Sequence, residues 1–400
     1  MTFARARGTL EVGGMQMSNE REREAMRRAR AFIDALTVDA PDGDPKAIVE
    51  DEGRFFAWDN EHRSPSTGKT FLFDWSYYIG IVMEGLYYMY EAGAGARYRD
   101  YAKRYLHAVE TGGHLNRYAG YTPDHGVDCY KTASLLPFFM EEDAELRALA
   151  DELFDDLARK NARHTEDALG GNYWHVWRDE KPPRYRVWLD GLYMSQVFLA
   201  RYARKTGDGE TLRRVAARFR WVNENLINPE NGLLYHAGNG KGDVCPFHWL
   251  RASGWYQMAQ ADVLECLEGD DRRALSADFE RLSRALLRFR DPSTGLWNNL
   301  IDQSAENGNR AESSGTAMLA YSLQKGARLG LLPAELGEAG RDAFVRLTEE
   351  KLKAGALTDV YLVATASGED NYRNEAYYMP QEGKGVGPYI MAYAEMLRRG

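Results

Sequence analysis

Two kinds of helical segment alternate along this chain, and they differ in how charged residues are distributed around the helix. In the first kind, apolar side chains recur three or four positions apart, and charged residues fill the positions between them. Residues 143–160 show this pattern at Leu146, Leu149, Ala150, Leu153, Phe154 and Leu157. The same pattern covers 20–36, 97–111, 210–226, 272–288 and 335–352. It predicts helices that bury one face only.

The second kind of segment carries little charge and is rich in glycine, alanine and aromatic residues. It covers 75–91, 128–140, 191–202, 252–267, 313–328 and 385–397. A helix that is apolar around most of its circumference is covered on most sides, so we expect these segments to lie inside. They recur about every 60 residues, and a regular period of this kind indicates a repeat architecture.

Strict alternation of inner and outer helices predicts an all-α protein with an (α/α)6 barrel. The connections before the inner helices are long and polar, so ring closure would gather them at one mouth of the barrel. An open superhelix of helical hairpins, such as a TPR scaffold, is the alternative, but no short consensus of that kind repeats here. We expect residues 1–19 to be a flexible N-terminal segment and residues 20–400 to form one catalytic domain.

Composition narrows the classes of partner. The 400 residues are 44% hydrophobic and 28% charged, as in ordinary globular proteins that bury a large core. A net charge of −9 argues against a broad surface for nucleic acid or anionic membranes. The 24 tyrosines and 9 tryptophans suit either a sugar-binding cleft or an ordinary core.

The same composition bears on the compartment. The three cysteines form no paired framework, which favours a reducing environment. No signal-peptide pattern and no apolar stretch long enough to cross a bilayer is present, so we expect a cytoplasmic protein. The nearest approach to a metal motif is Cys245-Pro246-Phe247-His248, which has no partner pair, and we expect no metal or organic cofactor.

Asp190 is the most informative residue, because it is an acid set among apolar neighbours in Trp188-Leu189-Asp190-Gly191-Leu192. A buried carboxylate is costly, so it is paired, hydrogen-bonded or held protonated by a raised pKa. A protonated aspartic acid at neutral pH is what general-acid catalysis requires. The alternative interpretation is that Asp190 only caps the helix that follows.

Five stretches, in this order, resemble the unsaturated uronyl hydrolases, particularly glycoside hydrolase family 105 and the related family 88. They are 75–80 (WSYYIG), 188–194 (WLDGLYM), 248–255 (HWLRASGW), 312–318 (ESSGTAM) and 383–387 (GKGVG). The second and third are the most specific. The resemblance implies an (α/α)6 barrel, in agreement with the helix pattern.

The resemblance also implies a reaction. The substrate is an oligosaccharide left by a polysaccharide lyase, whose terminal uronic acid carries a C4=C5 double bond. An aspartic acid protonates C4, water adds at C5, and the resulting hemiketal opens to release the shortened sugar. This differs from ordinary glycosidases, which use two carboxylates around an oxocarbenium ion at C1.

Residue by residue, the resemblance implies that Asp190 is the general acid and base. It places a second active-site aspartate at Asp128, although Cys129-Tyr130-Lys131-Thr132 departs from the family pattern. A carboxylate there would raise the pKa of Asp190 by like-charge repulsion. Asp124 is the substitute candidate, and an N-cap role is the alternative for Asp128.

The remaining candidates would bind the sugar: Tyr77, His175, His236, Trp249, Arg251 and Trp255. Arg251 suits the substrate carboxylate, because a guanidinium is always charged and can bind a carboxylate with two hydrogen bonds. Its alternative is a structural salt bridge, and for the aromatic residues the alternative is core packing. The link from His175 to Asp190 is longer than is usual in the family, and the link from His236 to Trp249 is shorter.

Other functions stay open at this point. Asp190 with Asp128 would suit an inverting glycosidase, whereas a sugar epimerase on the same barrel would use a histidine pair. A lanthionine-cyclase-like barrel needs a Cys/Cys/His zinc site, and a non-catalytic sugar-binding scaffold needs a groove but no protonated acid. The sequence leaves open galacturonyl or glucuronyl substrate, the linkage, the neighbouring sugar and the oligomeric state.

Overall fold

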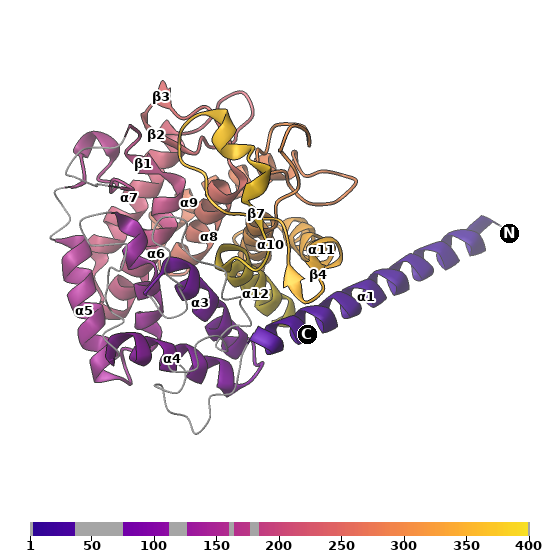
Figure 1. The fold of residues 1–400 in the computed structure, drawn as a ribbon, viewed down its shortest axis with the longest axis horizontal. Helices are drawn as coiled ribbons and strands as arrows, with labels where there is room; N and C mark the ends of the chain where they lie inside the picture. Colours follow the sequence, from indigo (N-terminus) through magenta and orange to yellow (C-terminus); the bar gives the residue numbers. More distant parts are fainter. Residues whose placement is uncertain (1–2, 37–74, 112–125, 160–163, 177–183, 399–400) are drawn as a thin grey trace.

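The computed structural model describes residues 3–36, 75–111, 126–159, 164–176 and 184–398. Five charge-poor segments form α-helices of the inner layer (Figure 1). These are α3 (Tyr77–Glu91), α6 (Leu189–Thr206), α8 (Leu250–Val263), α10 (Ser313–Arg328) and α12 (Gly383–Leu397). The sixth inner position is filled by two short 3-10 helices, η2 (Val127–Tyr130) and η3 (Thr132–Phe138).

These inner elements form a closed ring. η3 packs between α3 and α6, and α6, α8, α10 and α12 then follow one another. α12 returns to pack along α3, which closes the circle. At this last contact, a Cβ atom on Gly387 would lie 2.8 Å from the backbone of Ile81, so the two helices approach as closely as glycine permits. The (α/α)6 barrel is confirmed, and the open superhelix is wrong.

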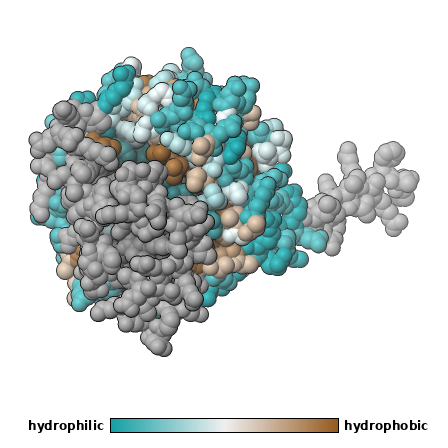
Figure 2. All heavy atoms as spheres, in the orientation of Figure 1, coloured by the Kyte–Doolittle hydropathy of each residue, from teal (hydrophilic) through white to brown (hydrophobic). Residues whose placement is uncertain are grey.

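The amphipathic segments form the outer layer: α1 (Phe3–Leu36), α4 (Ala96–Thr111), α5 (Ala144–Ala158), α7 (Gly209–Asn225), α9 (Gly269–Leu287) and α11 (Ala334–Lys351). Each packs against the inner ring or its neighbouring helix with its apolar face. Figure 2 shows hydrophilic residues over much of the described surface. None of the described helices is long and apolar enough to span a membrane.

The structure differs from the helix pattern in two places. The segment 128–140 was expected to be one helix, but it is split into η2 and η3. Pro137 lies inside η3 and supplies no N–H donor there. At the N-terminus, α1 runs from Phe3 and projects away from the barrel (Figure 1). The flexibility expected for 1–19 and the single-domain boundary stay predictions.

Short strands follow the outer helices and precede the inner ones. β1 (Val187–Trp188) leads into α6 and pairs with β2 (Ala237–Gly240), which pairs with β3 (Asp243–Val244). Between α11 and α12, β4 (Leu352–Lys353) pairs with β5 (Ala356–Leu357), and β6 (Val360–Tyr361) pairs with β7 (Tyr378–Met379). The strands therefore collect near the N-terminal ends of the inner helices, where the long polar connections were expected.

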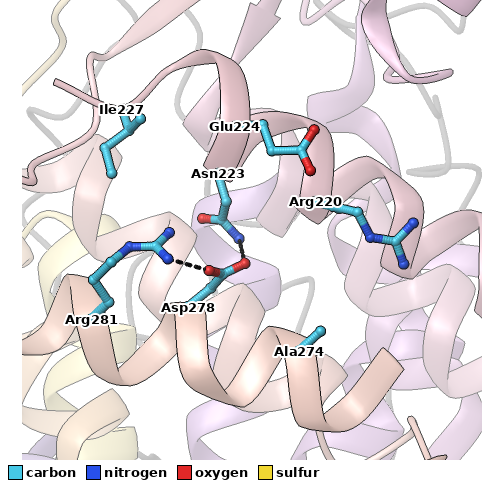
Figure 3. Close-up of a pocket in the computed structure, with 7 residues that line it drawn as sticks. All are labelled: Arg220, Asn223, Glu224, Ile227, Ala274, Asp278 and Arg281. Atoms are coloured by element: carbon cyan, nitrogen blue, oxygen red, sulfur yellow. Dashed lines mark hydrogen bonds and ion pairs between the residues drawn. The ribbon is translucent and has the colours of Figure 1, made fainter. Parts of the chain in front are cut away.

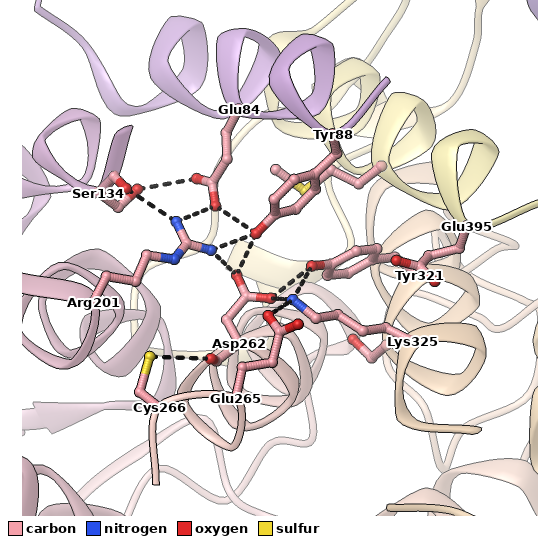
Figure 4. Close-up of polar contacts among 12 residues, drawn as sticks. Glu84, Tyr88, Ser134, Arg201, Asp262, Glu265, Cys266, Tyr321, Lys325 and Glu395 are labelled. Atoms are coloured by element: carbon pink, nitrogen blue, oxygen red, sulfur yellow. Dashed lines mark hydrogen bonds and ion pairs between the residues drawn. The ribbon is translucent and has the colours of Figure 1, made fainter. Parts of the chain in front are cut away.

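A buried polar network lies further along the inner helices, toward their C-terminal ends (Figure 4). Arg201 of α6 reaches across the ring and forms ion pairs with Glu84 of α3 at 2.6 Å and with Asp262 of α8 at 2.8 Å. Lys325 of α10 pairs with the other oxygen of Asp262 at 2.8 Å, and Lys131 pairs with Glu84. These opposite charges compensate one another, which is what allows them to be buried.

Candidate active site

Asp190 lies in the first turn of α6, directly after β1. The register of β1 with β2 places Trp188 opposite Ala237, and the N–H of Leu189 donates to the carbonyl of His236 at 3.1 Å. This pairing brings the Asp190 and His236 side chains together, with Oδ2 of Asp190 3.3 Å from Nε2 of His236. Trp188, not Asp190, holds the N-cap position of α6, so the capping interpretation of Asp190 is wrong.

The two facing atoms are buried without a regular partner. The His236 side chain is fully buried and that of Asp190 is 11% exposed. Among the described residues, neither Oδ2 of Asp190 nor Nε2 of His236 has a hydrogen bond of normal geometry. Since buried polar groups are nearly always hydrogen-bonded, an unsatisfied pair of this kind marks a position where a polar atom of a ligand fits.

The pKa of Asp190 is set by its two histidine neighbours as well as by burial. Burial alone would raise the pKa of its carboxyl, but contact with His236 and the nearby His175 outweighs this, so the pKa is lowered from its ordinary value. Of the outcomes expected for a buried carboxylate, pairing is therefore the one that the structure has, and a raised pKa is not. Asp190 is an ionised carboxylate there, and it is poised to accept a proton.

His236 is held from behind by Tyr372, which lies in the 3-10 helix η7 (Glu369–Tyr372) between β6 and β7. The Tyr372 hydroxyl lies 2.7 Å from Nδ1 of His236. Tyr372 is fully buried, and burial raises the pKa of its hydroxyl, which keeps the proton on the oxygen. A hydroxyl that donates to Nδ1 leaves the imidazole proton on Nε2, facing Asp190.

Asp128 and His175 form a second acid–imidazole pair at the site. Nε2 of His175 lies 3.7 Å from Oδ1 of Asp128, and the His175 ring stacks on Trp188 with centroids 4.6 Å apart. Gly126, at φ 154°, makes the approach possible, because a Cβ atom there would lie 2.5 Å from the His175 carbonyl oxygen. Gly126 is also the N-cap of η2, so Asp128 is not. Asp124 lies outside the described residues.

Trp249 packs next to His236, and Arg251 packs next to Trp249. The Trp249 ring lies 4.9 Å from the His236 ring, and the Arg251 guanidinium lies 4.6 Å from the Trp249 ring centre. The terminal nitrogens of Arg251 are already occupied: one donates to the carbonyl of Tyr361, and the other donates to that of Leu362 at 3.0 Å. Within the described structure only Nε of Arg251 lacks a partner. Nη1 also donates to the Ser314 hydroxyl at 3.4 Å, so an end-on pair of hydrogen bonds from Nη1 and Nη2 to a substrate carboxylate would require an Nη1 contact to break. Nε–H and the second N–H of Nη2 stay available.

Trp255 and Tyr77 lie together on the ring wall. Trp255 is 2% exposed, stacks on Tyr193 with centroids 5.1 Å apart, and meets Tyr77 edge-on at 6.4 Å. Tyr193 is one turn beyond Asp190 on α6, which places this aromatic group beside the acid. The packing resembles a core as much as a binding wall, so the sugar-contacting roles of Trp255 and Tyr77 stay predictions.

A separate hollow of about 530 Å³ lies between the outer helices α7 and α9 (Figure 3). It is lined by Arg220, Asn223, Glu224, Ile227, Ala274, Asp278 and Arg281. Asp278 accepts from Asn223 at 2.8 Å and pairs with Arg281 at 2.6 Å, so these polar groups satisfy one another. None of the residues expected at the active site lines this hollow, and it is not the candidate site.

The sequence element Cys245-Pro246-Phe247-His248 is also accounted for by local contacts. The Cys245 sulfur lies 3.4 Å from the Tyr372 hydroxyl, whereas Nδ1 of His248 contacts the carbonyl of Leu234 at 3.0 Å. Across the described ranges, His, Cys, Asp and Glu side chains do not gather in threes as a metal site requires.

Sequence reasoning missed two residues close to this site. Tyr372 is 136 positions from the histidine that it contacts, and it is one of 24 tyrosines with no motif around it. Lys384 lies within a stretch used for the resemblance, but its charge was overlooked. The available signal in the sequence was a lysine between two glycines at the start of a charge-poor segment.

Comparison with known proteins identifies the chain as a glycoside hydrolase. The model of Glycosyl Hydrolase Family 88 matches residues 52–400, and the chain belongs to this family. It is similar to Protein Atu3128 of Agrobacterium fabrum, with 34% identity over 230 residues, covering 51% of this chain and 98% of that protein. It is also 28% identical over 149 residues to the unsaturated rhamnogalacturonyl hydrolase YesR of Bacillus subtilis, covering 36% of this chain and 42% of YesR.

Solved structures of glycoside hydrolases share the fold of this chain. A family 105 glycoside hydrolase of C. acetobutylicum superposes with a TM-score of 0.69 at 29% identity, covering 80% of this chain and 93% of that one. The unsaturated glucuronyl hydrolase of Bacillus sp. GL1 has a TM-score of 0.58 at 19% identity, covering 81% and 86%, and supports the fold alone. The family resemblance inferred from the sequence is confirmed.

Proposed function

We propose that the protein removes the terminal 4,5-unsaturated uronic acid from oligosaccharides produced by polysaccharide lyases. The observation that carries this proposal is the buried Asp190–His236 pair, whose facing atoms lack regular partners. It lies among the Trp188, Trp249 and His175 rings, and flat aromatic groups suit the flattened ring of an unsaturated sugar. Membership of family 88 supports the reaction class.

In the proposed reaction, Asp190 carries out both proton transfers. Its protonated carboxyl gives the proton to C4, and the C4=C5 electrons form the new C4–H bond, which leaves an oxocarbenium centre at C5. Water adds to C5, and its proton returns to the Asp190 carboxylate. The C5 hemiketal opens by cleavage of its bond to the ring oxygen. C1 then becomes an aldehyde and releases the shortened sugar as an alcohol.

The lowered pKa of Asp190 requires that a proton be taken up when substrate binds. The substrate brings its own carboxylate, and a second negative charge near a buried acid raises the pKa of that acid. On this proposal, binding converts Asp190 from an ionised group into a proton donor. His236, with its proton on Nε2, orients the Asp190 carboxylate, while His175 and Asp128 contact the sugar or the water.

The test follows loss of the ultraviolet absorbance of the conjugated double bond. The panel is unsaturated galacturonyl-rhamnose together with unsaturated glucuronyl disaccharides. Asp190→Asn cannot donate a proton, and positioned proton transfer contributes 10²–10⁴-fold, so we expect a loss of kcat of roughly 100- to 10,000-fold. Asp270→Asn, at a side chain that is 93% exposed on α9, is the matched control and keeps full activity. Turnover by Asp190→Asn within tenfold of wild type would remove Asp190 from this role.

A further inference from the structure

The proposed function, on which this inference rests, needs a cation that recognises the substrate carboxylate. Every substrate of the proposed class carries a carboxylate on the reacting sugar. A carboxylate that enters a buried site needs a positively charged donor there. Arg251 has both terminal nitrogens on the carbonyls of Tyr361 and Leu362, and it anchors β6 to α8. Nη1 also donates to Ser314, so Arg251 keeps only Nε–H and the second N–H of Nη2 for a ligand.

Lys384 is a second buried cation on the same side of the ring. It lies in the first turn of α12 and is 6% exposed. A Cβ atom on the adjacent Gly385 would lie 2.5 Å from a Val360 methyl group, so this turn packs directly against β6, the strand that Arg251 also contacts. The Lys384 ammonium lies 5.6 Å from the centre of the Tyr78 ring, and Tyr78 contacts Tyr77 at 5.1 Å.

The charges around Lys384 also connect it to the site. Burial lowers the pKa of its ammonium, the carboxylate of Glu382 opposes this shift, and the charges of Arg251 and Asp128 are both near enough to contribute. The charge on Lys384 therefore interacts with the Asp128 carboxylate and with the Arg251 guanidinium.

Lys384 differs from the other two buried lysines in its number of partners. Lys131 is bound by Glu84 and Ser134, and Lys325 is bound by Asp262, Glu265 and Tyr321. Among the described residues, Lys384 has an ion pair with Glu382 alone, at 3.0 Å, and the geometry does not satisfy Oε2 of Glu382 as a hydrogen-bond acceptor. An ammonium has three N–H donors, so Lys384 retains donors for an incoming anion.

We propose that Lys384 binds the carboxylate of the unsaturated uronic acid and makes the enzyme prefer the free acid to its neutral ester. Arg251 contributes at most two further hydrogen bonds, from Nε and from the second N–H of Nη2. The ligand is recognised as a planar carboxylate next to a C=C bond.

The experiment compares two forms of the disaccharide that wild type hydrolyses fastest: the free acid and its uronate methyl ester, both followed by ultraviolet absorbance. We expect Lys384→Met to lower kcat/KM for the acid about 30-fold, mainly through KM, as for loss of one hydrogen bond to a charged group. For the ester we expect a change of less than about threefold, because no ionic partner is lost. Lys384→Arg keeps the charge and restores the preference for the acid in part.

Two further variants separate this role from a structural one. Lys384→Met removes the cation beside the partly buried Glu382 carboxylate. Lys384→Met/Glu382→Gln removes both charges, and we expect the same loss of acid preference. Lys205→Met, at an exposed ion pair with Glu141 on the last turn of α6, leaves both substrates unaffected. Equal losses on acid and ester, or no loss on either, would overturn the role of Lys384. Wild-type inactivity on every disaccharide would instead overturn the proposed function, and this inference with it.

Discussion

Replacement of Arg201 by methionine tests the buried polar network without touching the candidate site. Methionine approximates the length of the arginine side chain and carries no charge. Arg201 is the residue that joins α6 to both α3 and α8 across the ring, through Glu84 and Asp262 (Figure 4). Its loss therefore removes ion pairs on both sides while leaving the outer helices and the strands unchanged.

The magnitude follows from the charge count of the network. Glu84, Asp262 and Glu265 are negative, and Lys131, Arg201 and Lys325 are positive, so three charges of each sign balance. Arg201→Met leaves one excess negative charge beside two carboxylates that are fully buried. Removal of one partner from a buried ion pair costs about 3–5 kcal/mol, because the remaining charge is uncompensated.

Urea unfolding followed by circular dichroism measures this cost as a change in the free energy of unfolding. Arg201→Met/Glu84→Gln restores neutrality and should recover about half of the loss. Arg204→Met is the control, because Arg204 lies on the same helix in a surface pair with Glu268 and should cost about 0–1 kcal/mol. A loss below about 1 kcal/mol for Arg201→Met, or no recovery in the double variant, would refute the charge-balance reasoning.

Three further outcomes are expected. Tyr372→Phe leaves Nδ1 of His236 buried without a partner, so kcat should fall about tenfold or more with an altered pH–rate profile and an unchanged KM; an unchanged profile would refute the tautomer role. Gly126→Ala strains a φ of 154°, so it should cost about 1–3 kcal/mol in urea unfolding and lower kcat/KM, whereas Gly368→Ala, with open space around it, should do neither. Because the pKa of Asp190 is lowered in the fold, its charge stabilises wild type fully above about pH 4, and this stabilisation is lost as pH falls through the folded pKa. The difference in free energy of unfolding between wild type and Asp190→Asn should therefore shrink on acidification. A difference that grows on acidification would contradict the lowered pKa.

Helix patterning predicted most of the barrel because each inner helix is apolar on nearly all sides. The exception was 128–140, which forms two 3-10 helices, with Pro137 inside the second. Asp190 was identified from its own neighbours, and its partner His236 was identified by resemblance. Their contact at 3.3 Å depends on the pairing of β1 with β2, two-residue and four-residue strands that no local pattern signals.

The rest of the site depends on contacts between distant parts of the chain. The pKa of Asp190 follows from two histidines placed by loops, so an apolar sequence around an aspartate did not predict its direction. Arg251 was expected to bind the substrate carboxylate, which stays a prediction, and its terminal nitrogens also bind the backbone of Tyr361 and Leu362, about 110 positions away. Tyr372 and Lys384 both follow the last outer helix, where only the folded chain shows which side chains enter the ring.

Protonation at C4 with hydration at C5 can be followed by product analysis in D₂O. The enzyme would be incubated briefly with its preferred unsaturated disaccharide, and the released keto acid examined by NMR before non-enzymatic exchange occurs. We expect one deuterium at C4, added to a single face, with the C4=C5 bond consumed as the sugar is released. Release of the sugar with the double bond intact and no deuterium at C4 would show direct attack at C1, and would contradict the account.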